Sequence, residues 1–195
     1  KVFGVKANAI TSNTHLYVDR SSDSNESGNY YIFTTKLYLD NSLNGSMLSA
    51  APSFATLDFR IKGTTNIFYT VNLRRIKINK DTPDESRGLA ITPKNDTSTY
   101  LNKNDIIAYN NWVDLTVEFH LNDATKTASV KYYVGEKLIA TESASYAAAL
   151  VGEVPNRVDI KYISGTSSKT FVDDVSFVRS ETPFIGSAEE GGENE

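Results

Sequence analysis

Four polar side chains alternate along residues 112–121, and their types could do chemistry together. Spaced two apart, they are Asp114, Thr116, Glu118 and His120. In an extended strand this spacing puts all four on one face. Two carboxylates on one face could hydrolyse a glycosidic bond, but residues i and i+4 of a strand lie about 13 Å apart, against about 5 to 9.5 Å in glycosidases. The spacing therefore favours a solvated polar face over a hydrolase site.

The residues between these four are apolar, so the segment predicts a half-buried strand. They are Val113, Leu115, Val117, Phe119 and Leu121. Residues 30–40 repeat the alternation, with Tyr31, Phe33, Leu37 and Leu39 facing inward and Tyr30, Lys36, Tyr38 and Asp40 facing outward. A period of two indicates strands that bury one face against a second layer.

Further strand-like runs cover most of the chain, joined by turns rich in Asn, Asp, Gly and Ser. They are residues 15–19, 54–62, 67–78, 89–92, 128–134, 137–142, 157–164 and 169–179. Only residues 145–151 favour a short helical turn, bounded by Gly152 and Pro155. The pattern predicts an all-β fold, a two-sheet antiparallel β-sandwich of the jelly-roll kind with about ten or more strands. We expect one β-sandwich domain over residues 1–185 and a flexible acidic tail or linker over residues 186–195.

The charge distribution argues against nucleic acid as a partner. The net charge is −4, but four glutamates fall in the tail, and without them acidic and basic residues are equal at 20 each. A neutral body lacks the basic surface that phosphate neutralisation needs. The longest apolar run, residues 147–151, is far shorter than the roughly 20 residues of a membrane helix, so we expect no membrane insertion.

Cysteine is absent, which excludes disulfides and thiolate chemistry. With only two histidines, His15 and His120, and no Gly-x-Ser-x-Gly motif, a serine triad has little support. We treat an enzymatic role as uncertain and disfavoured.

Two segments carry a resemblance to a known superfamily. Residues 111–119 with the hairpin 127–138 resemble the tryptophan strand and following hairpin of concanavalin A-like, laminin G-like jelly rolls. Residues 170–177 resemble the last strand of many bacterial carbohydrate-associated jelly rolls. The resemblance covers residues 1 to about 180 and implies an exported bacterial protein, located outside the cell or on its surface. It also implies glycan chemistry, although such folds host binding modules, adhesins, hydrolases and lyases alike.

The resemblance leaves the catalytic motifs of the superfamily unmatched. Laminarinase-type members carry a Glu-x-Asp-x-(x)-Glu strand, and Thr116 occupies the position of its middle Asp. The Gln-x-His strand of alginate lyases is absent as well. We therefore name no catalytic residue.

Outward aromatic side chains form the predicted carbohydrate-binding platform, because sugars stack their C–H faces on flat rings beside polar groups. The predicted binding residues are Tyr30, Tyr38, Trp112, Asp114 and Tyr133. Each of the aromatics has the alternative of covering a sheet or a core edge. The long polar loop of residues 79–104 is a candidate rim for a cleft.

A structural calcium is the predicted cofactor. Its expected ligands are Asp173 and Asp174, the first because strand parity places it on the inner face and a buried carboxylate needs a partner. In similar jelly rolls an Asp of the last strand commonly binds calcium, which the resemblance implies here. Loops beginning at Asp23 and Asp40 have calcium-loop spacing but lack the final glutamate, so ordinary turns are the better interpretation.

These observations favour a non-catalytic carbohydrate-binding module, a monomeric domain of a larger secreted or surface protein whose partner is a glycan or polysaccharide. The alternatives are a structural or adhesive surface domain without a sugar site, and a glycoside hydrolase or polysaccharide lyase.

Overall fold

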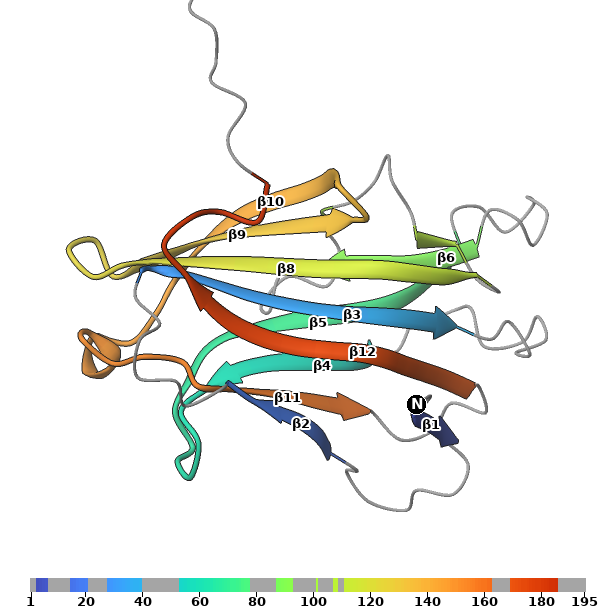
Figure 1. Cartoon of the computed structure of the whole chain (residues 1–195), viewed down its shortest axis with the longest axis horizontal. Helices are drawn as coiled ribbons and strands as arrows, with labels where there is room; N and C mark the ends of the chain where they lie inside the picture. Colours follow the sequence, from blue (N-terminus) through green and yellow to red (C-terminus); the bar gives the residue numbers. More distant parts are fainter. Residues whose placement is uncertain are drawn as a thin grey trace, which may run out of the picture.

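The computed structural model confirms an all-β sandwich (Figure 1). It describes residues 3–6, 15–20, 28–39, 53–77, 87–92, 101, 107–108, 111–162 and 169–185. Two six-stranded antiparallel sheets face each other. Sheet 1 has the order β1 (Phe3–Lys6), β12 (Lys169–Ser180), β3 (Tyr30–Leu39), β8 (Trp112–Asn122), β9 (Thr127–Val134) and β10 (Lys137–Ser145). Sheet 2 has the order β2 (His15–Asp19), β11 (Arg157–Tyr162), β4 (Ser53–Arg60), β5 (Ile67–Lys77), β6 (Arg87–Thr92) and β7 (Ile107–Ala108).

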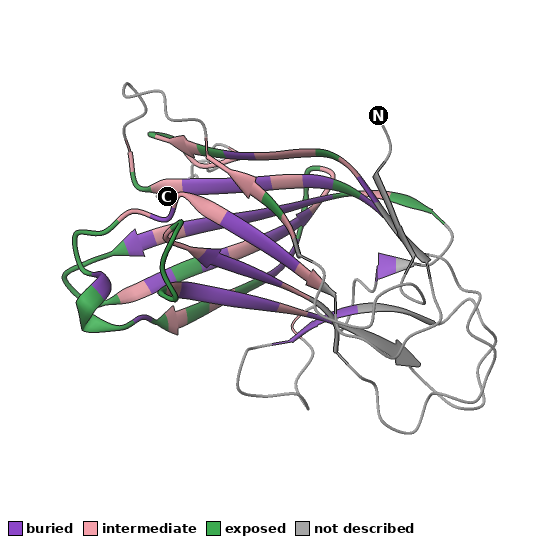
Figure 2. Ribbon diagram, turned by 90° about the horizontal axis from the view of Figure 1, so that it is seen from below, coloured by how far each residue is buried: buried purple, intermediate pink, exposed green. Residues whose placement is uncertain are grey.

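Aromatic rings from both sheets fill the space between them. Phe59 of sheet 2 packs on Phe33, Phe119 and Phe177 of sheet 1, with ring centroids 6.3, 5.5 and 5.8 Å away. Tyr69 stacks on Phe119 at 5.8 Å. Offset and edge-to-face contacts of this kind add to the burial of apolar area. The core therefore lies in one layer between the sheets, and Figure 2 shows buried segments running along it.

The predicted alternation is confirmed on the inward side of both sheet-1 strands. Tyr31, Phe33 and Leu37 of β3 are buried, as are Leu115, Val117, Phe119 and Leu121 of β8. Their register is antiparallel, with Phe33 opposite Val117 and Tyr31 opposite Phe119. The even-numbered residues of these strands consequently form the outer face of sheet 1, which points away from sheet 2.

Two short edge strands, β1 and β7, were not predicted, and the expected helical turn at residues 145–151 is reduced to one 3-10 helix, Ala148–Leu150. Strands of two to four residues carry too little alternation to be recognised. A seven-residue helix has too few internal hydrogen bonds to form without packing. No described helix has the length and apolar character needed to cross a membrane.

A bulge in β12 corrects the parity argument for Asp173. The pairing with β3 shifts register between Asp173 and Ser176, and Asp174 has a φ of +47°. The extra residue reverses the alternation on its N-terminal side, so Val172 and Phe177 are both buried although they are an odd number of positions apart. Asp173 is half-buried rather than a core carboxylate.

Candidate functional site

The strand register brings the five predicted carbohydrate-binding residues to one surface, the outer face of sheet 1. Tyr38 of β3 lies opposite Trp112 of β8, and Tyr30 lies opposite His120. Asp114 lies opposite Lys36, and Tyr133 of β9 lies opposite Thr116. Alternation in antiparallel strands accounts for this gathering, because residues two apart share a face and directly opposite residues share it too.

Tyr38 and Trp112 form an aromatic platform at one end of this face. Their ring centroids are 5.6 Å apart, with an angle of 51° between the ring planes. Trp112 is 46% exposed, a large value for a tryptophan side chain. An exposed apolar ring beside a second ring is a typical surface for stacking a flat apolar ligand face.

Charged groups lie directly beside the aromatic platform. The Lys36 Nζ atom is 2.6 Å from Asp174 Oδ2, and both side chains are largely exposed. Their hydrogen bond, with the attraction of the opposite charges, raises the pKa of Lys36 and lowers that of Asp174. Asp114, also exposed, lies opposite Lys36. Donors and acceptors of both signs are thus available next to the rings, as recognition of hydroxyl groups requires.

The middle of the outer face is covered by the C-terminal strap, residues 181–185. The backbone N–H of Phe184 donates to Glu118 Oε2 at 2.6 Å, and the Phe184 ring lies 5.3 Å from that of Tyr133. Figure 1 shows this segment turning back over β8 and β9 after β12. Lys131 is the second partner of Glu118, 3.5 Å from Oε1.

The strap corrects two expectations about this face. Tyr133, predicted as an open binding residue, is only 4% exposed, and Glu118, predicted on a solvated face, is 1% exposed. Burial raises the pKa of Tyr133, as does the neighbouring Glu118 carboxylate. The aromatic residue that covers them, Phe184, follows the last strand and has no period-two partner, so alternation gave no signal for it.

The far end of the outer face carries Tyr30, which is half-buried and stacks on His120 with centroids 4.5 Å apart and planes 19° apart. Trp112 and His120 are eight positions apart on one strand, roughly 27 Å at about 3.4 Å per residue. With the strap between them, the two aromatic pairs occupy separate ends of this face. The open part of the predicted site is therefore the aromatic platform with Asp114.

The predicted calcium ligands do not make a calcium site by themselves. Asp173 Oδ1 accepts the backbone N–H of Asp174, and the Asp174 carboxylate is paired with Lys36. Calcium takes about six to eight oxygen ligands, and in the described part of the chain no group of three or more acidic or histidine side chains could hold a metal. Asp23 and Asp40 lie outside the described residues. Calcium at Asp173 and Asp174 stays a prediction.

Sheet 2 also carries a pair of carboxylates, which the sequence analysis did not predict. Asp58 and Asp159 lie directly opposite each other on the outer face of that sheet and are buried. Each already has a cation, Lys161 for Asp58 and Arg60 for Asp159 at 2.8 Å. Thr70 also donates to Asp58, at 2.7 Å. With these partners the two carboxylates serve as a buried ion-pair network that joins β4 to its neighbours.

Comparisons with known proteins concern the fold. No protein-family model matches the chain, and no curated protein sequence matches it. Among solved structures, the chain is similar to "Cellulose induced protein, Cip1" (9% identity, 84% of this chain and 72% of the other, TM-score 0.46). It is also similar to a GH131 beta-glucanase catalytic domain from Podospora anserina (10% identity, 90% and 70%, TM-score 0.47). A third is the lectin I-B4 from Griffonia simplicifolia (15% identity, 85% and 79%, TM-score 0.37).

The two antiparallel sheets themselves confirm the fold class that the sequence predicted, and these likenesses, with TM-scores below 0.5, add no argument to it. At such identities they concern the fold alone, and we take no residue role from them.

Proposed function

We propose that this domain is a non-catalytic carbohydrate-binding module that binds a glycan or polysaccharide on the aromatic platform of Tyr38 and Trp112. The observation that carries the proposal is the exposed Trp112 ring, 46% accessible, packed beside Tyr38 on a strand face and next to three charged side chains. Exposed tryptophan with convergent polar groups is the usual composition of a site that stacks sugar rings.

The platform offers each part of a sugar a matching group. The apolar C–H face of a pyranose ring stacks on the indole, and Tyr38, inclined to it, forms the side wall. Asp114 accepts hydrogen bonds from ring hydroxyls, while Lys36 donates to ring or hydroxyl oxygens. Because the site is an open surface, it suits a segment of an extended chain better than a small enclosed molecule.

The state of Glu118 supports binding over hydrolysis. Glycoside hydrolysis needs two carboxylates that both face the substrate. Of the two carboxylates on β8, Asp114 is exposed, whereas Glu118 lies under the strap and is bonded to Phe184 and Lys131. A pair built from these two would have one member sealed from any ligand on the platform.

We place the domain, as part of this proposal, in a secreted or surface-attached bacterial protein, acting as a monomeric domain of a larger chain. The exposed indole of Trp112 supports this proposal over a purely structural spacer, and the binding test below separates it from an adhesive domain without a sugar site. An exposed ring of this kind is removed at little cost in stability, so its function can be tested by mutation.

Trp112 is the single tryptophan of the chain, which makes intrinsic fluorescence a reporter of this site alone. We expect one or more soluble polysaccharides in a panel to shift or quench the emission in a saturable way. Trp112→Ala, read by affinity electrophoresis or calorimetry, should weaken binding at least tenfold. Tyr38→Ala and Asp114→Ala should weaken it several-fold.

The matched control is Tyr17→Ala, which removes an exposed aromatic ring from sheet 2, where Tyr17 is 59% exposed and stacked under Arg157. Binding should be unchanged in this variant. Saturable polysaccharide binding that Trp112→Ala leaves intact would overturn the platform as the site. Absence of binding across a broad glycan panel would favour the structural-domain alternative.

A further inference from the structure

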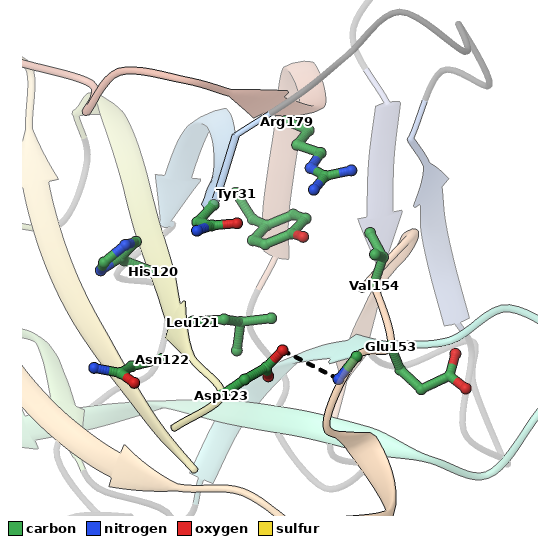
Figure 3. A pocket seen from close by; sticks show the side chains of 10 residues that line it. Tyr31, His120, Leu121, Asn122, Asp123, Glu153, Val154 and Arg179 are labelled. Atoms are coloured by element: carbon green, nitrogen blue, oxygen red, sulfur yellow. Dashed lines mark hydrogen bonds between the residues drawn. The ribbon is translucent and has the colours of Figure 1, made fainter. Parts of the chain in front are cut away.

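A concave site, which we call the end pocket, lies at the end of the sandwich where β3 begins and β8 and β12 end (Figure 3). Its volume is about 350 Å³, at the lower limit of the range for small-molecule sites, so it suits one ring-sized molecule. The lining is mainly polar: Tyr31, His120, Asn122, Asp123 and Arg179 contribute to it, and Leu121 and Val154 add apolar surface. None of these residues belongs to the aromatic platform.

One wall of this end pocket is fixed by Asp123. Its Oδ1 accepts the hydroxyl of Tyr146 at 2.5 Å, and its Oδ2 accepts the backbone N–H of Gly152 at 3.1 Å. These bonds hold the segment before β11, which contributes Glu153 and Val154, against the turn between β8 and β9. The bond with Asp123 also contributes, after burial, to raising the pKa of Tyr146 to about 12. The wall is therefore preformed rather than assembled by a ligand.

The opposite wall is cationic. Arg179 lines the pocket, with its Nε donating to the carbonyl of Gly28 at 2.6 Å and its guanidinium carbon 5.7 Å from the centroid of the Tyr31 ring. Burial raises the pKa of Tyr31, and Arg179 and Arg20 both act in the opposite direction. Figure 3 shows Arg179 on one side of Tyr31, with Asp123 and Glu153 on the other.

We infer that the end pocket binds an acidic sugar unit, with the carboxylate of a uronic acid at Arg179 and its hydroxyls at Asp123 and Asn122. A guanidinium presents a planar fork that matches a carboxylate. The Asp123 oxygens, each already bonded to one protein donor, have lone pairs left to accept hydroxyl groups. Tyr31, which is only 2% exposed, closes the pocket between the two walls.

A neutral hexose and a free amino acid would also fit the size of the pocket. Their charges distinguish them from an acidic sugar. A neutral hexose would not use the Arg179 wall, and a free amino acid would need an acidic group for its ammonium. Asp123 accepts two protein hydrogen bonds and Glu153 is exposed, so the anionic wall suits hydroxyls better than a cation. The inference shares its ligand class with the proposed function but not its site, and each can fail alone.

The test compares methyl glucuronoside, methyl glucoside and glutamate by two-dimensional amide NMR of the intact chain. We expect the glucuronoside to shift the amides of Asn29, Asp123 and Gly152 in a saturable way, and to bind at least tenfold more tightly than the glucoside. Arg179→Gln should remove this preference. Val154→Phe, which fills the pocket and leaves Arg179 in place, should remove binding of both sugars while the spectrum stays that of the folded chain.

In the same NMR spectra, a shift of the Trp112 indole N–H signal reports binding at the aromatic platform. Glucuronoside shifts that survive Trp112→Ala keep the end pocket independent of the aromatic platform. Equal affinity for the two sugars, a preference that survives Arg179→Gln, tighter binding of glutamate, or shifts confined to the Trp112 indole would each overturn the inference. A saturable polysaccharide effect on Trp112 with a silent end pocket would overturn this inference alone.

Discussion

The backbone N–H of Phe184 donates to Glu118 Oε2 across 2.6 Å and so ties the C-terminal strap to an interior strand of sheet 1. The carboxylate it meets is almost completely buried and is shared with Lys131. A buried charge of this kind is stable only while its partners are in place. The strap is therefore a part of the folded domain that limits how much of the outer face is open.

Replacing Glu118 should loosen the strap. Glu118→Gln removes the carboxylate charge from the contacts with Phe184 and Lys131, and we expect a loss of about 1–2 kcal/mol in the free energy of unfolding. Urea unfolding measures the loss, and faster hydrogen exchange at the Phe184 amide locates it. Glu136→Gln, an exposed glutamate in the turn after β9, is the control and should change stability by less than about 0.5 kcal/mol. If the Phe184 amide exchanged at the same rate in Glu118→Gln and Glu136→Gln, the hydrogen bond from Phe184 to Glu118 would be contradicted.

The fold was predictable because alternation is repeated over long strands. Residues 30–39 and 112–121 contain four or five apolar positions on one side. Those from Tyr31 to Leu37 and from Leu115 to Leu121 are buried as expected, Val113 is half-buried, and the burial of Leu39 is not among the described features. Strands β1 and β7 are too short for this argument, and their existence depends on pairing with β12 and β6. Alternation along a long strand predicts which of its faces is buried. A short edge strand forms because it pairs with a neighbouring strand, which its own sequence does not predict.

The candidate site was predictable only in part. Alternation correctly put Tyr38, Trp112 and Asp114 on one face, because their exposure depends on their own strands. It failed for Tyr133, which is covered by a segment 50 residues further along, and for Asp173, where one extra residue in β12 inverts the pattern. Coverage by a distant segment and a bulge both arise from tertiary structure, which a period of two does not contain.

Glu142 should make stability depend on pH. It accepts a hydrogen bond from Tyr132 at 2.5 Å, and Tyr132 is in turn 3.0 Å from the hydroxyl of Tyr69 in the core. Burial raises the pKa of Glu142 from 4.5 to about 7. The folded state therefore holds a proton that the unfolded state releases, so the free energy of unfolding falls as pH rises from about 4.5 to 7.

The loss attributable to Glu142 is at most about 3 kcal/mol. Glu142→Gln, which is neutral at every pH, should flatten this part of the stability curve and raise stability at pH 8 relative to the parent chain. Chemical unfolding at pH 4.5, 6, 7 and 8 makes the comparison, with Glu136→Gln as the exposed control. The same slope in Glu142→Gln and the parent would rule out Glu142 as its source.

Removing divalent cations tests the calcium prediction at Asp173 and Asp174. Because Lys36 already pairs with Asp174, we expect the melting temperature in excess EDTA to equal that in excess calcium. Lys36→Ala should leave the Asp174 carboxylate without its cation and change the melting temperature little, since the ion pair is exposed. A fall in melting temperature with EDTA that calcium reverses, and that Asp173→Asn abolishes, would establish the metal instead.

Gly28 should be intolerant of any side chain. Its φ is +102°, and a Cβ atom added there would collide with the backbone carbonyl of Ser180, at the end of β12. Both the left-handed backbone and the close approach need glycine, and the Gly28 carbonyl also accepts the bond from Arg179. Gly28→Ala should therefore cost more than about 3 kcal/mol, well above the roughly 1 kcal/mol of the backbone effect alone.

The matched control is Gly63→Ala, which has a φ of +77° but open space around the added Cβ. It isolates the backbone effect, so it should cost about 1 kcal/mol. Thermal or urea unfolding of the two variants gives the difference directly. If Gly28→Ala were no more destabilising than Gly63→Ala, the contact between Gly28 and Ser180 would not be as close as described, and the adjoining wall of the end pocket would have to be wider.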